Sequence, residues 1–437
     1  MKTRPLLLIL VGLAQVASAV THAVLPGETI QAKVDIAQPG DIIAIFGGTY
    51  PGDVTINKAV RLVEVDGQEV TITGNVTWSG LTDAPPFEGF TVGSAGKKIT
   101  VINGTNVVFK GVDTRAGDRM LVQGGATNVD ILNSQIRGVD QEGGTVIIQN
   151  SIISQNVTSN IACKKTFLIR SKVQALSSSL GSEKVYIAYS EIGGLTYNAI
   201  NGTIRVIGSK FDGQISTVDN LLISGTGCDV LVANSSFINT VWGKWNNSPE
   251  HYGRGINIGI SNKSRIFNNH VYTSIIENNT AHATIDFAGG DGIRVADTNS
   301  VIQNNIIWGI PNWAITAPFG ALVTNNCLWG YWRGGSRGGF IPEATFVSTP
   351  GVVDISSNPV SLQPTSPCVN TGSPNPVFND LDGTRNDVGP GGGCLFDPEG
   401  WTTDKPVVIS FDLAPQQLLK GVDTQVTISN GQAVGQP

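Results

Sequence analysis

The sequence is poor in charged residues, and no segment of it concentrates positive charge. Only 14% of its 437 residues are Asp, Glu, Lys or Arg, and acidic residues outnumber basic ones by 34 to 28. The absence of a Lys/Arg-rich run argues against nucleic acid as a partner. Beyond the N-terminus no uninterrupted apolar run reaches the roughly 18 residues of a membrane-spanning helix, so no transmembrane segment is expected after leader cleavage. Asn, Ser, Thr, Val and Ile replace helix formers in the middle of the chain, and with 53 Gly they favour short strands and tight turns.

The N-terminus has the features of a secretory signal peptide. Lys2 and Arg4 precede an apolar run that continues to Ala17, and Ala17–Ala19 provides small residues for cleavage. We therefore expect residues 1–19 to be removed and the mature chain to begin at about Val20. Loss of two basic residues changes the formal charge from −6 to −8. The protein is expected to be monomeric and either secreted or held at the cell surface.

A short pattern recurs through the middle of the chain: an apolar residue, then Ser or Asn three positions later, then a second apolar residue two positions further on. Units too short for a crossover helix and too regular for a Greek key predict a solenoid of stacked parallel strands. The Ser and Asn side chains should then form hydrogen bonds along the axis at the turns. The nine repeats are Ile131-Ser134-Ile136, Ile148-Ser151-Ile153, Leu168-Ser171-Val173, Ile187-Ser190-Ile192, Val206-Ser209-Phe211, Val232-Ser235-Phe237, Ile266-Asn269-Val271, Ile302-Asn305-Ile307 and Val323-Asn326-Leu328.

The beginning of the mature chain, with Gly27–Ala32, Gln38–Asp41, Gly48–Tyr50 and Val54–Lys58, resembles the start of the pectin-lyase-like superfamily. The resemblance implies an all-β fold, a right-handed single-stranded parallel β-helix with an N-terminal capping helix. It does not imply one activity, because this superfamily includes lyases, hydrolases, epimerases, adhesins and inert scaffolds. A cap is needed because the first rung would otherwise expose a strand edge and the end of the core.

The segments Ser366–Gly372 and Asn379–Gly389 are similar to the terminal module of bacterial choice-of-anchor surface proteins. The resemblance implies that this region closes the solenoid. It differs from the usual module in having Asn370-Thr371 and no sorting signal afterwards. The predicted organisation is a signal peptide at 1–19, cap and first rung at 20–60, β-helix at 61–347, closing module at 348–400 and a strand-like tail at 401–437, which could begin a further module.

Long insertions interrupt three consecutive repeats between Ser209 and Asn305, where the Ser/Asn positions are 26, 34 and 36 residues apart instead of 17 to 21. Insertions on neighbouring rungs build one raised wall, predicted at 238–299, and such walls commonly form the binding face of a repeat protein. The alternative is that the loops only cover the solenoid. The site candidates in the wall are Trp242, Lys244, Trp245, His251, Tyr252, Arg254, Asp286, Asp291 and Arg294.

Tyr272, Trp308 and Trp329 each follow the last apolar position of a late repeat. In one register they would form an aromatic ladder on which sugar rings could stack, unless the ladder points inward or lies under a loop. The sequence therefore predicts a β-helix protein that interacts with extracellular polysaccharide, and a passive structural or adhesin role remains an alternative.

A polysaccharide lyase acting on a uronic-acid-containing glycan is the enzymatic alternative. It needs a base and a group that neutralises the developing negative charge, and Lys244, His251, Tyr252 and Arg254 are the candidates. A glycoside hydrolase, which needs two carboxylates across the scissile bond, is less favoured. The sequence has neither the Gly-His-Gly of polygalacturonases nor the Arg-x-Pro-x-x-Arg of the major pectate lyases. Whether the protein is an enzyme is left open.

No cofactor is required by these interpretations, but two groups of carboxylates suit Ca²⁺, which prefers clustered oxygen ligands. They are Asp286 with Asp291 in the wall and Asp380 with Asp382 in the closing module, where a turn held by Asx side chains is the alternative. Of the five cysteines, Cys368 and Cys394 are predicted to form a disulfide. Cys163 and Cys228 are predicted to be buried thiols three rungs apart, and Cys327 to be a core residue.

Overall fold

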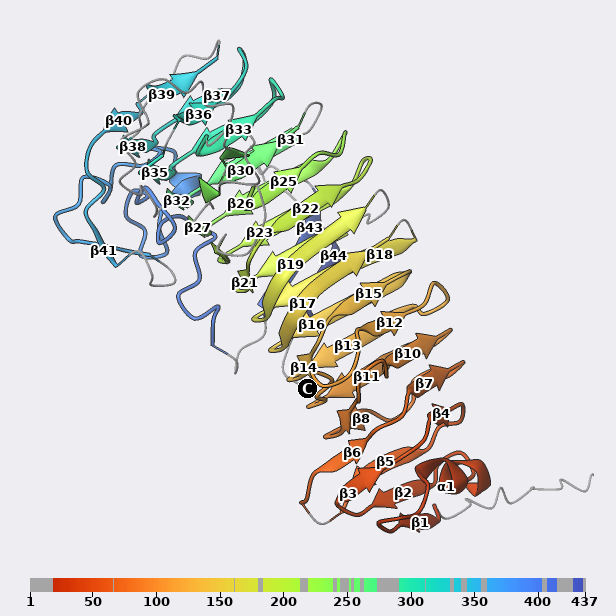
Figure 1. The fold of residues 1–437 in the computed structure, drawn as a ribbon. Coiled ribbons are helices and arrows are strands. Elements are labelled where there is room, and N and C mark those ends of the chain that lie inside the picture. Colours follow the sequence, from red (N-terminus) through yellow and green to blue (C-terminus); the bar gives the residue numbers. More distant parts are fainter. Residues whose placement is uncertain are drawn as a thin grey trace, which may run out of the picture.

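The structure is a computed structural model that describes residues 19–65, 67–160, 162–179, 184–212, 219–238, 242–243, 251–252, 255–259, 263–272, 291–310, 312–330, 334–338, 344–354, 360–402, 407–414 and 427–434. Nearly all of the predicted signal peptide lies outside these residues. The fold-class prediction is confirmed: the chain is an all-β, right-handed parallel β-helix in which short strands stack as successive rungs (Figure 1). Among the described residues there is no helix of the length and apolarity needed to cross a membrane.

Each rung contributes strands to three parallel sheets. The first sheet begins with β1 (Thr21–Val24), β2 (Ile42–Ile45) and β5 (Arg61–Glu64). In the following rungs its place is taken by a separate eleven-stranded sheet that contacts β5 and is counted with the first sheet here: β8 (Phe87–Glu88), β11 (Val107–Lys110), β13 (Asn128–Leu132), β16 (Gly144–Gln149), β18 (Cys163–Ile169), β20 (Lys184–Ala188), β23 (Thr203–Ile207), β26 (Asp229–Ala233), β31 (Lys263–Phe267), β34 (Val301–Gln303) and β37 (Leu322–Thr324).

The second sheet follows the first after a two-residue turn. Two of its strands, β17 and β19, continue around the corner into the third sheet. Its strands are β3 (Gly48–Tyr50), β6 (Val70–Ile72), β9 (Thr91–Val92), β14 (Gln135–Ile136), β17 (Ile152–Ser159), β19 (Lys172–Ser179), β21 (Glu191–Ile192), β24 (Lys210–Asp212), β27 (Ser236–Ile238), β32 (His270–Tyr272), β35 (Ile306–Trp308), β38 (Cys327–Trp329) and β40 (Phe346–Val347).

The third sheet completes each rung before the chain returns to the first. It also contains the second halves of β17 and β19. Its other strands are β4 (Val54–Ile56), β7 (Val76–Ser79), β10 (Ile99–Ile102), β12 (Met120–Val122), β15 (Val139–Gln141), β22 (Leu195–Asn198), β25 (Leu221–Ile223), β30 (Ile256–Ile258), β33 (Ile293–Val295), β36 (Trp313–Thr316) and β39 (Gly334–Arg337).

The predicted register of the nine repeats is confirmed in full. The first apolar positions pair from strand to strand in the first sheet, from Ile131 to Val323, and the last ones pair in the second sheet, from Ile136 to Leu328. All are buried in one continuous core. Each buried aliphatic side chain contributes roughly 1.5–3 kcal/mol, so the solenoid is stabilised by the same contact repeated along its length.

The Ser and Asn positions form the expected ladder along the axis. Each backbone N–H donates to the side-chain oxygen one rung above, as from Ser171 to Ser190 (3.2 Å) and from Asn269 to Asn305 (2.9 Å). The residue immediately before each ladder position has a positive φ, between 47° and 59°. Asn tolerates this left-handed conformation better than most residues, which explains why Asn occupies it in six of the nine repeats.

The N-terminal end is closed by the expected helix, α1 (Ile30–Ile36). Ile30 and Val34 are buried, and α1 packs against β1, β2 and β4. The ammonium of Lys58 donates to the carbonyl oxygens of Asp35 (2.9 Å) and Ala37 (3.0 Å) at the helix C-terminus. A cation there satisfies orphan carbonyls and favours the helix dipole.

Residues 366–402, here called the strap, run back along the turn between the first and second sheets. Figure 1 shows this segment in blue beside the rungs that contain β32 to β21. The strap includes a single-turn helix, η1 (Pro376–Phe378), and antiparallel pairs lie before and after it. These are β41 (Val352–Asp354) with β42 (Ser361–Leu362), and β43 (Val407–Ala414) with β44 (Thr427–Val434).

The strap binds the left-handed turn residues of successive rungs in reverse order. Near its start Gly372 accepts a hydrogen bond from Asn325, and near its end Gly400 accepts one from Arg170. Between them Asn268 donates to the carbonyl oxygens of Asp387 (2.8 Å) and Gly389 (3.2 Å). The Asn residues that relieve strain at the turns therefore also attach the strap.

Candidate functional site

The three long insertions all connect the second sheet to the third. They join β24 to β25, β27 to β30 and β32 to β33. Within them the structure describes residues 219–220, 291–292 and an antiparallel pair formed by β28 (Trp242–Gly243) and β29 (His251–Tyr252). All three insertions therefore leave from the second sheet and return to the third, while most of their residues lie outside the described part of the chain, so the wall predicted at 238–299 stays a prediction.

Several predicted site residues fall outside the described residues: Lys244, Trp245, Arg254 and Asp286. Trp242, His251, Tyr252 and Tyr272 are described through their backbone only. The pairing places Trp242 opposite Tyr252 and Gly243 opposite His251, which brings three candidates onto one ribbon. The roles predicted for all these residues stay predictions.

The described foot of the wall lies beside one outward row of the third sheet. Continuous cross-strand pairing puts Asn257, Arg294, Thr316 and Arg337 in that row. Arg294 and Arg337 are exposed, and neither side chain has a hydrogen-bond or ion-pair partner among the described residues. Strands one rung apart are about 4.8 Å apart, so these two side chains start roughly 10 Å apart on the same face.

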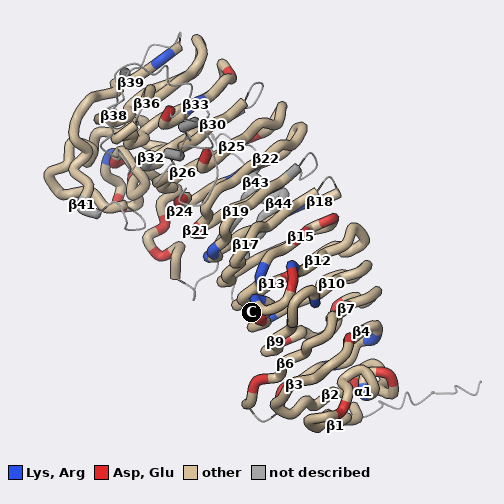
Figure 2. Tube along the Cα trace, viewed as in Figure 1, with Lys and Arg blue, Asp and Glu red and all other residues tan. Residues whose placement is uncertain are grey.

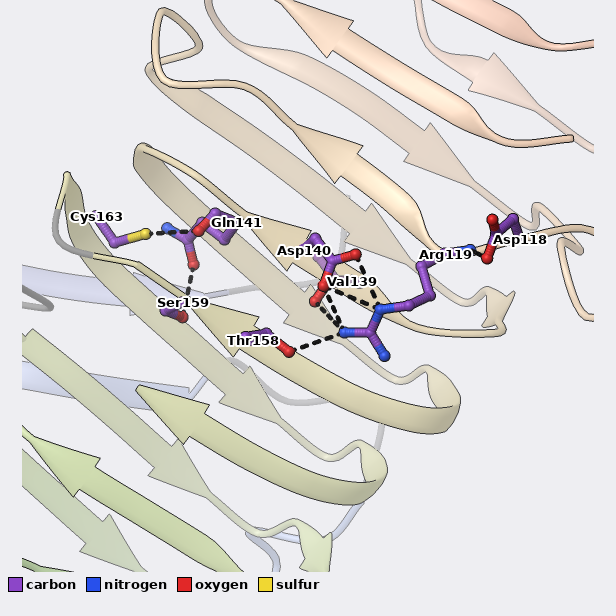
Figure 3. A network of polar contacts seen from close by, with 8 residues as sticks. All are labelled: Asp118, Arg119, Val139, Asp140, Gln141, Thr158, Ser159 and Cys163. Carbon is purple, nitrogen blue, oxygen red and sulfur yellow. Dashed lines mark hydrogen bonds and ion pairs between the residues drawn. The ribbon is translucent and has the colours of Figure 1, made fainter. Parts of the chain in front are cut away.

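In rungs closer to the N-terminus the same row contains a carboxylate, Asp140, which forms an ion pair. Figure 3 shows the guanidinium of Arg119 bound to both carboxylate oxygens of Asp140, with Thr158 accepting a further hydrogen bond at 2.9 Å. That cation is neutralised by its neighbour. Among the described residues of the row, no carboxylate follows Asp140 towards the C-terminal rungs. Figure 2 shows charged residues scattered thinly over the rungs, with a blue segment on β39.

Two buried carboxylates lie where the wall enters the third sheet. Asp219 is 6% exposed and accepts a hydrogen bond from Asn257 (2.8 Å), while Asp291 is 5% exposed and accepts one from Asn312 (2.7 Å). Three buried polar atoms nearby have no partner among the described residues: Asn312 Oδ1, Trp313 Nε1 and Thr316 Oγ1. Unsatisfied buried groups are rare and commonly mark a place for water or a ligand.

The aromatic ladder has the predicted register. Tyr272 pairs with Trp308, and Trp308 pairs with Trp329. Ile307 and Leu328, the preceding residues, are buried in the core, so the tryptophan side chains are on the outer face. Trp329 is 41% exposed, whereas Trp308 is partly buried and packs against an apolar cluster that includes strap residues. Of the two tryptophans, Trp329 is therefore the more accessible.

Among the described residues no group of three Asp, Glu, His or Cys side chains is placed to hold a metal ion. Asp286 lies outside these residues, so both predicted Ca²⁺ groups stay predictions. Asp291 binds Asn312, as described above. Asp380 accepts backbone hydrogen bonds from Asp387 and Gly393, and Asp382 accepts bonds from the amide and hydroxyl of Thr384. These bonds are those of an Asx-stabilised turn.

Sequence reasoning missed Asn257, Asn312 and Arg337. The repeats were aligned on the first and second sheets, where the Ser/Asn ladder gives a strong signal. The third-sheet strands follow insertions of variable length, so their register was not visible. Aligning the apolar-x-apolar triplets at Leu221, Ile256 and Ile293 would have placed Asn257 next to Arg294.

Comparison with known proteins gives no family assignment: no family model matches the sequence, and no curated protein matches it. Among solved structures the chain is similar to PfbA, a surface adhesin of Streptococcus pneumoniae, with 12% identity and a TM-score of 0.35 over 76% of this chain and 93% of that chain. It is also similar to the pectate lyase Pel9A, with 12% identity and a TM-score of 0.25 over 86% and 97% of the two chains. At these low scores the likenesses support no inference about function, and the fold assignment rests on the strand register.

Proposed function

We propose that this protein binds an acidic extracellular polysaccharide along the upper outward row of the third sheet. The observation that carries the proposal is the pair of exposed guanidinium groups of Arg294 and Arg337, two rungs apart on one face, for which the described part of the chain supplies no side-chain partner. Arginine is suited to this role because its planar fork binds carboxylates and its charge is permanent.

The rungs of the solenoid repeat at a fixed spacing, as do the sugar units of a polysaccharide. Charges separated by two rungs, roughly 10 Å, can meet carboxylates on alternate sugars of an extended uronan without any rearrangement of the protein backbone. The absence of described carboxylates in this part of the row means that no internal ion pair has to be broken first. This preorganisation raises affinity because little ordering is needed on binding.

The groups around the arginines suit a sugar. Asn257 and Thr316 occupy the same outward row. Asn312 and Trp313 precede Thr316 in the chain, and each has a buried polar atom without a partner in the described part of the protein. The hydroxyl groups of a sugar can act as both donors and acceptors and would form hydrogen bonds with these buried polar atoms. On the other side of the wall, the exposed face of Trp329 offers a stacking surface for a second part of the polymer.

The experiment compares binding of polyuronates and neutral glycans by the wild type, Arg294→Gln and Arg337→Gln. Arg61→Gln is the matched control, because Arg61 is also exposed and without a side-chain partner among the described residues but lies on the first sheet. Exposed ion pairs contribute about 0.2–1 kcal/mol, so each variant should bind an oligomer several-fold more weakly, with the largest effect at low salt. Equal affinity of all four proteins for acidic glycans would contradict the proposal.

A lyase remains the second candidate, because the cationic row lies at the foot of the loops that contain Lys244, His251, Tyr252 and Arg254. Elimination from a uronan creates an unsaturated product that absorbs near 235 nm, a general property of that chemistry. A rise in absorbance that is lost in His251→Ala or Arg254→Ala would establish the enzyme. Binding without any rise, with or without Ca²⁺, favours the non-catalytic protein, and neither binding nor a rise favours a passive surface spike.

A further inference from the structure

Two cysteines from distant parts of the chain are buried together in one apolar cluster. Cys327 is the first residue of β38, and Cys368 belongs to the strap. Both are 0% exposed, and they share their cluster with Ile306 and Val388. The cluster lies on the outer side of the second sheet, where the strap covers the rungs, and it is separate from the large core inside the solenoid.

Backbone hydrogen bonds fix the two cysteines beside each other. Ile306 is the cross-strand partner of Cys327. The strap crosses this pair, because the amide of Gly389 donates to the carbonyl oxygen of Asn304 (2.8 Å) and the amide of Val388 donates to that of Cys368 (2.8 Å). Both side chains are therefore enclosed in the same small cluster, and the interaction between the two thiols lowers the pKa of Cys368.

The other cysteines have no such neighbour among the described residues. The thiol of Cys163 donates to the carbonyl oxygen of Gln141 (3.0 Å), and that of Cys228 donates to Ala199 (3.4 Å). Both are buried thiols, as predicted. All five cysteines are free thiols in this structure, so the predicted bond between Cys368 and Cys394 is not formed; Cys394 is exposed, whereas Cys368 is enclosed with Cys327.

We propose that Cys327 and Cys368 form a disulfide that fastens the strap to the solenoid. In this reaction a small-molecule or protein disulfide acts as the oxidant. The Cys368 thiolate attacks it, one thiol leaves, and the Cys327 thiolate then displaces the second thiol and completes the Cys327–Cys368 bond. The two cysteines lose two protons and two electrons, and the oxidant is reduced to two thiols.

The environment supports this order of events. The hydrogen bond from Cys327 lowers the pKa of the Cys368 thiol, which makes Cys368 the better first nucleophile. Because both sulfurs are enclosed after docking, the oxidant must reach them while the strap is still closing or during its transient opening. The bond would then turn a reversible contact into a covalent one and close a loop that includes β39 to β42.

The bond is tested by peptide mapping of full-length protein refolded with oxidised and reduced glutathione and then alkylated under denaturing conditions. Trypsin separates the three relevant cysteines, since Cys327 lies in residues 295–333, Cys368 in 338–385 and Cys394 in the peptide that begins at Asn386. The expected result is one linked pair, 295–333 with 338–385, which separates on reduction. Alkylation of both Cys327 and Cys368 without prior reduction, or linkage of Cys368 to Cys394, would overturn the proposal.

Single variants distinguish a cross-link from mere packing. Reduction should lower the melting temperature of the oxidised wild type by several degrees and speed proteolysis of the strap. The same treatment should leave Cys327→Ser and Cys368→Ser unchanged, whatever their starting stability, and Cys394→Ser should behave as the wild type. A wild-type protein whose melting temperature and strap proteolysis are insensitive to reduction would contradict the fastening role.

Discussion

Replacement of Asn268 by Ala should release the middle of the strap from the solenoid. Asn268 is 3% exposed, and its amide nitrogen lies 3.0 Å from Asn386 Oδ1, 2.8 Å from the Asp387 oxygen and 3.2 Å from the Gly389 oxygen. An NH₂ group has two hydrogens, so at least two strap acceptors lose a donor in the variant. Leaving a buried polar group unsatisfied costs about 1–3 kcal/mol, so the loss of two strap contacts should lower the stability of the docked strap by roughly 2–6 kcal/mol.

The substitution also strains the backbone, and this cost must be subtracted from the measured loss of stability. Asn268 has a φ of 50°, and Ala in this left-handed conformation costs about 1–2 kcal/mol. Asn150 is the matched control, since it has a φ of 49° at the equivalent turn, and among the described residues no strap group binds its side chain. The difference between Asn268→Ala and Asn150→Ala therefore measures the bonds that Asn268 makes to the strap, together with the longer bond that it accepts from Asn304 (3.4 Å).

Hydrogen exchange at Gly389 is the appropriate assay, because its amide bonds to the carbonyl oxygen of Asn304 in the solenoid only while the strap is docked. A loss of about 2–6 kcal/mol corresponds to roughly a 30- to 25,000-fold fall in protection, at 1.36 kcal/mol per tenfold change. Exchange should remain slow in the rungs below the strap. If Asn268→Ala and Asn150→Ala change protection at Gly389 equally, the side-chain bonds do not hold the strap.

Three further predictions concern single groups. Burial raises the pKa of Asp130 to about 6, so the carboxylate destabilises the fold increasingly as pH rises from about 4 to 6. In chemical denaturation, Asp130→Asn should then increase the unfolding free energy by up to about 3 kcal/mol at pH 7.5 and leave it unchanged at pH 3.5. Equal increases at both pH values would refute this. Ser190→Ala removes the acceptor of the Ser171 amide and should cost about 1–3 kcal/mol in the same assay, whereas an unchanged midpoint would show that the ladder bond is dispensable. Trp401→Ala removes the edge contact with Tyr189 and should make the end of the strap more sensitive to protease, with little change in the denaturation midpoint; unchanged cleavage would mean that this end is held by other contacts.

The periodic part of the fold was predictable because one physical requirement repeats. Every rung must bury apolar residues above and below and pair its turn amide along the axis, so positions such as Ile187, Ser190 and Ile192 recur at fixed spacing and their register could be aligned by eye. The resemblance at the N-terminus supplied the capping helix, which is too short to be inferred from periodicity.

The parts that were not predictable depend on contacts between segments far apart in the sequence. The pairing of Cys327 with Cys368 requires the strap to fold back across β35 and β38, and nothing local to Ser366–Gly372 specifies that path. Arg337 was missed for a related reason, since its row becomes visible only after the insertions are removed and the third-sheet strands are aligned. The aromatic ladder was found because it immediately follows a repeat position.

The most direct test of the proposed function is a crystal structure of the protein with a defined acidic oligosaccharide. The account predicts carboxylates of the oligosaccharide facing Arg294 and Arg337, with the chain running along the axis of the solenoid over Thr316. An oligosaccharide that instead occupies the groove of about 410 Å³ lined by Lys172 and Lys210 on the second sheet, with the arginine row unoccupied, would contradict it.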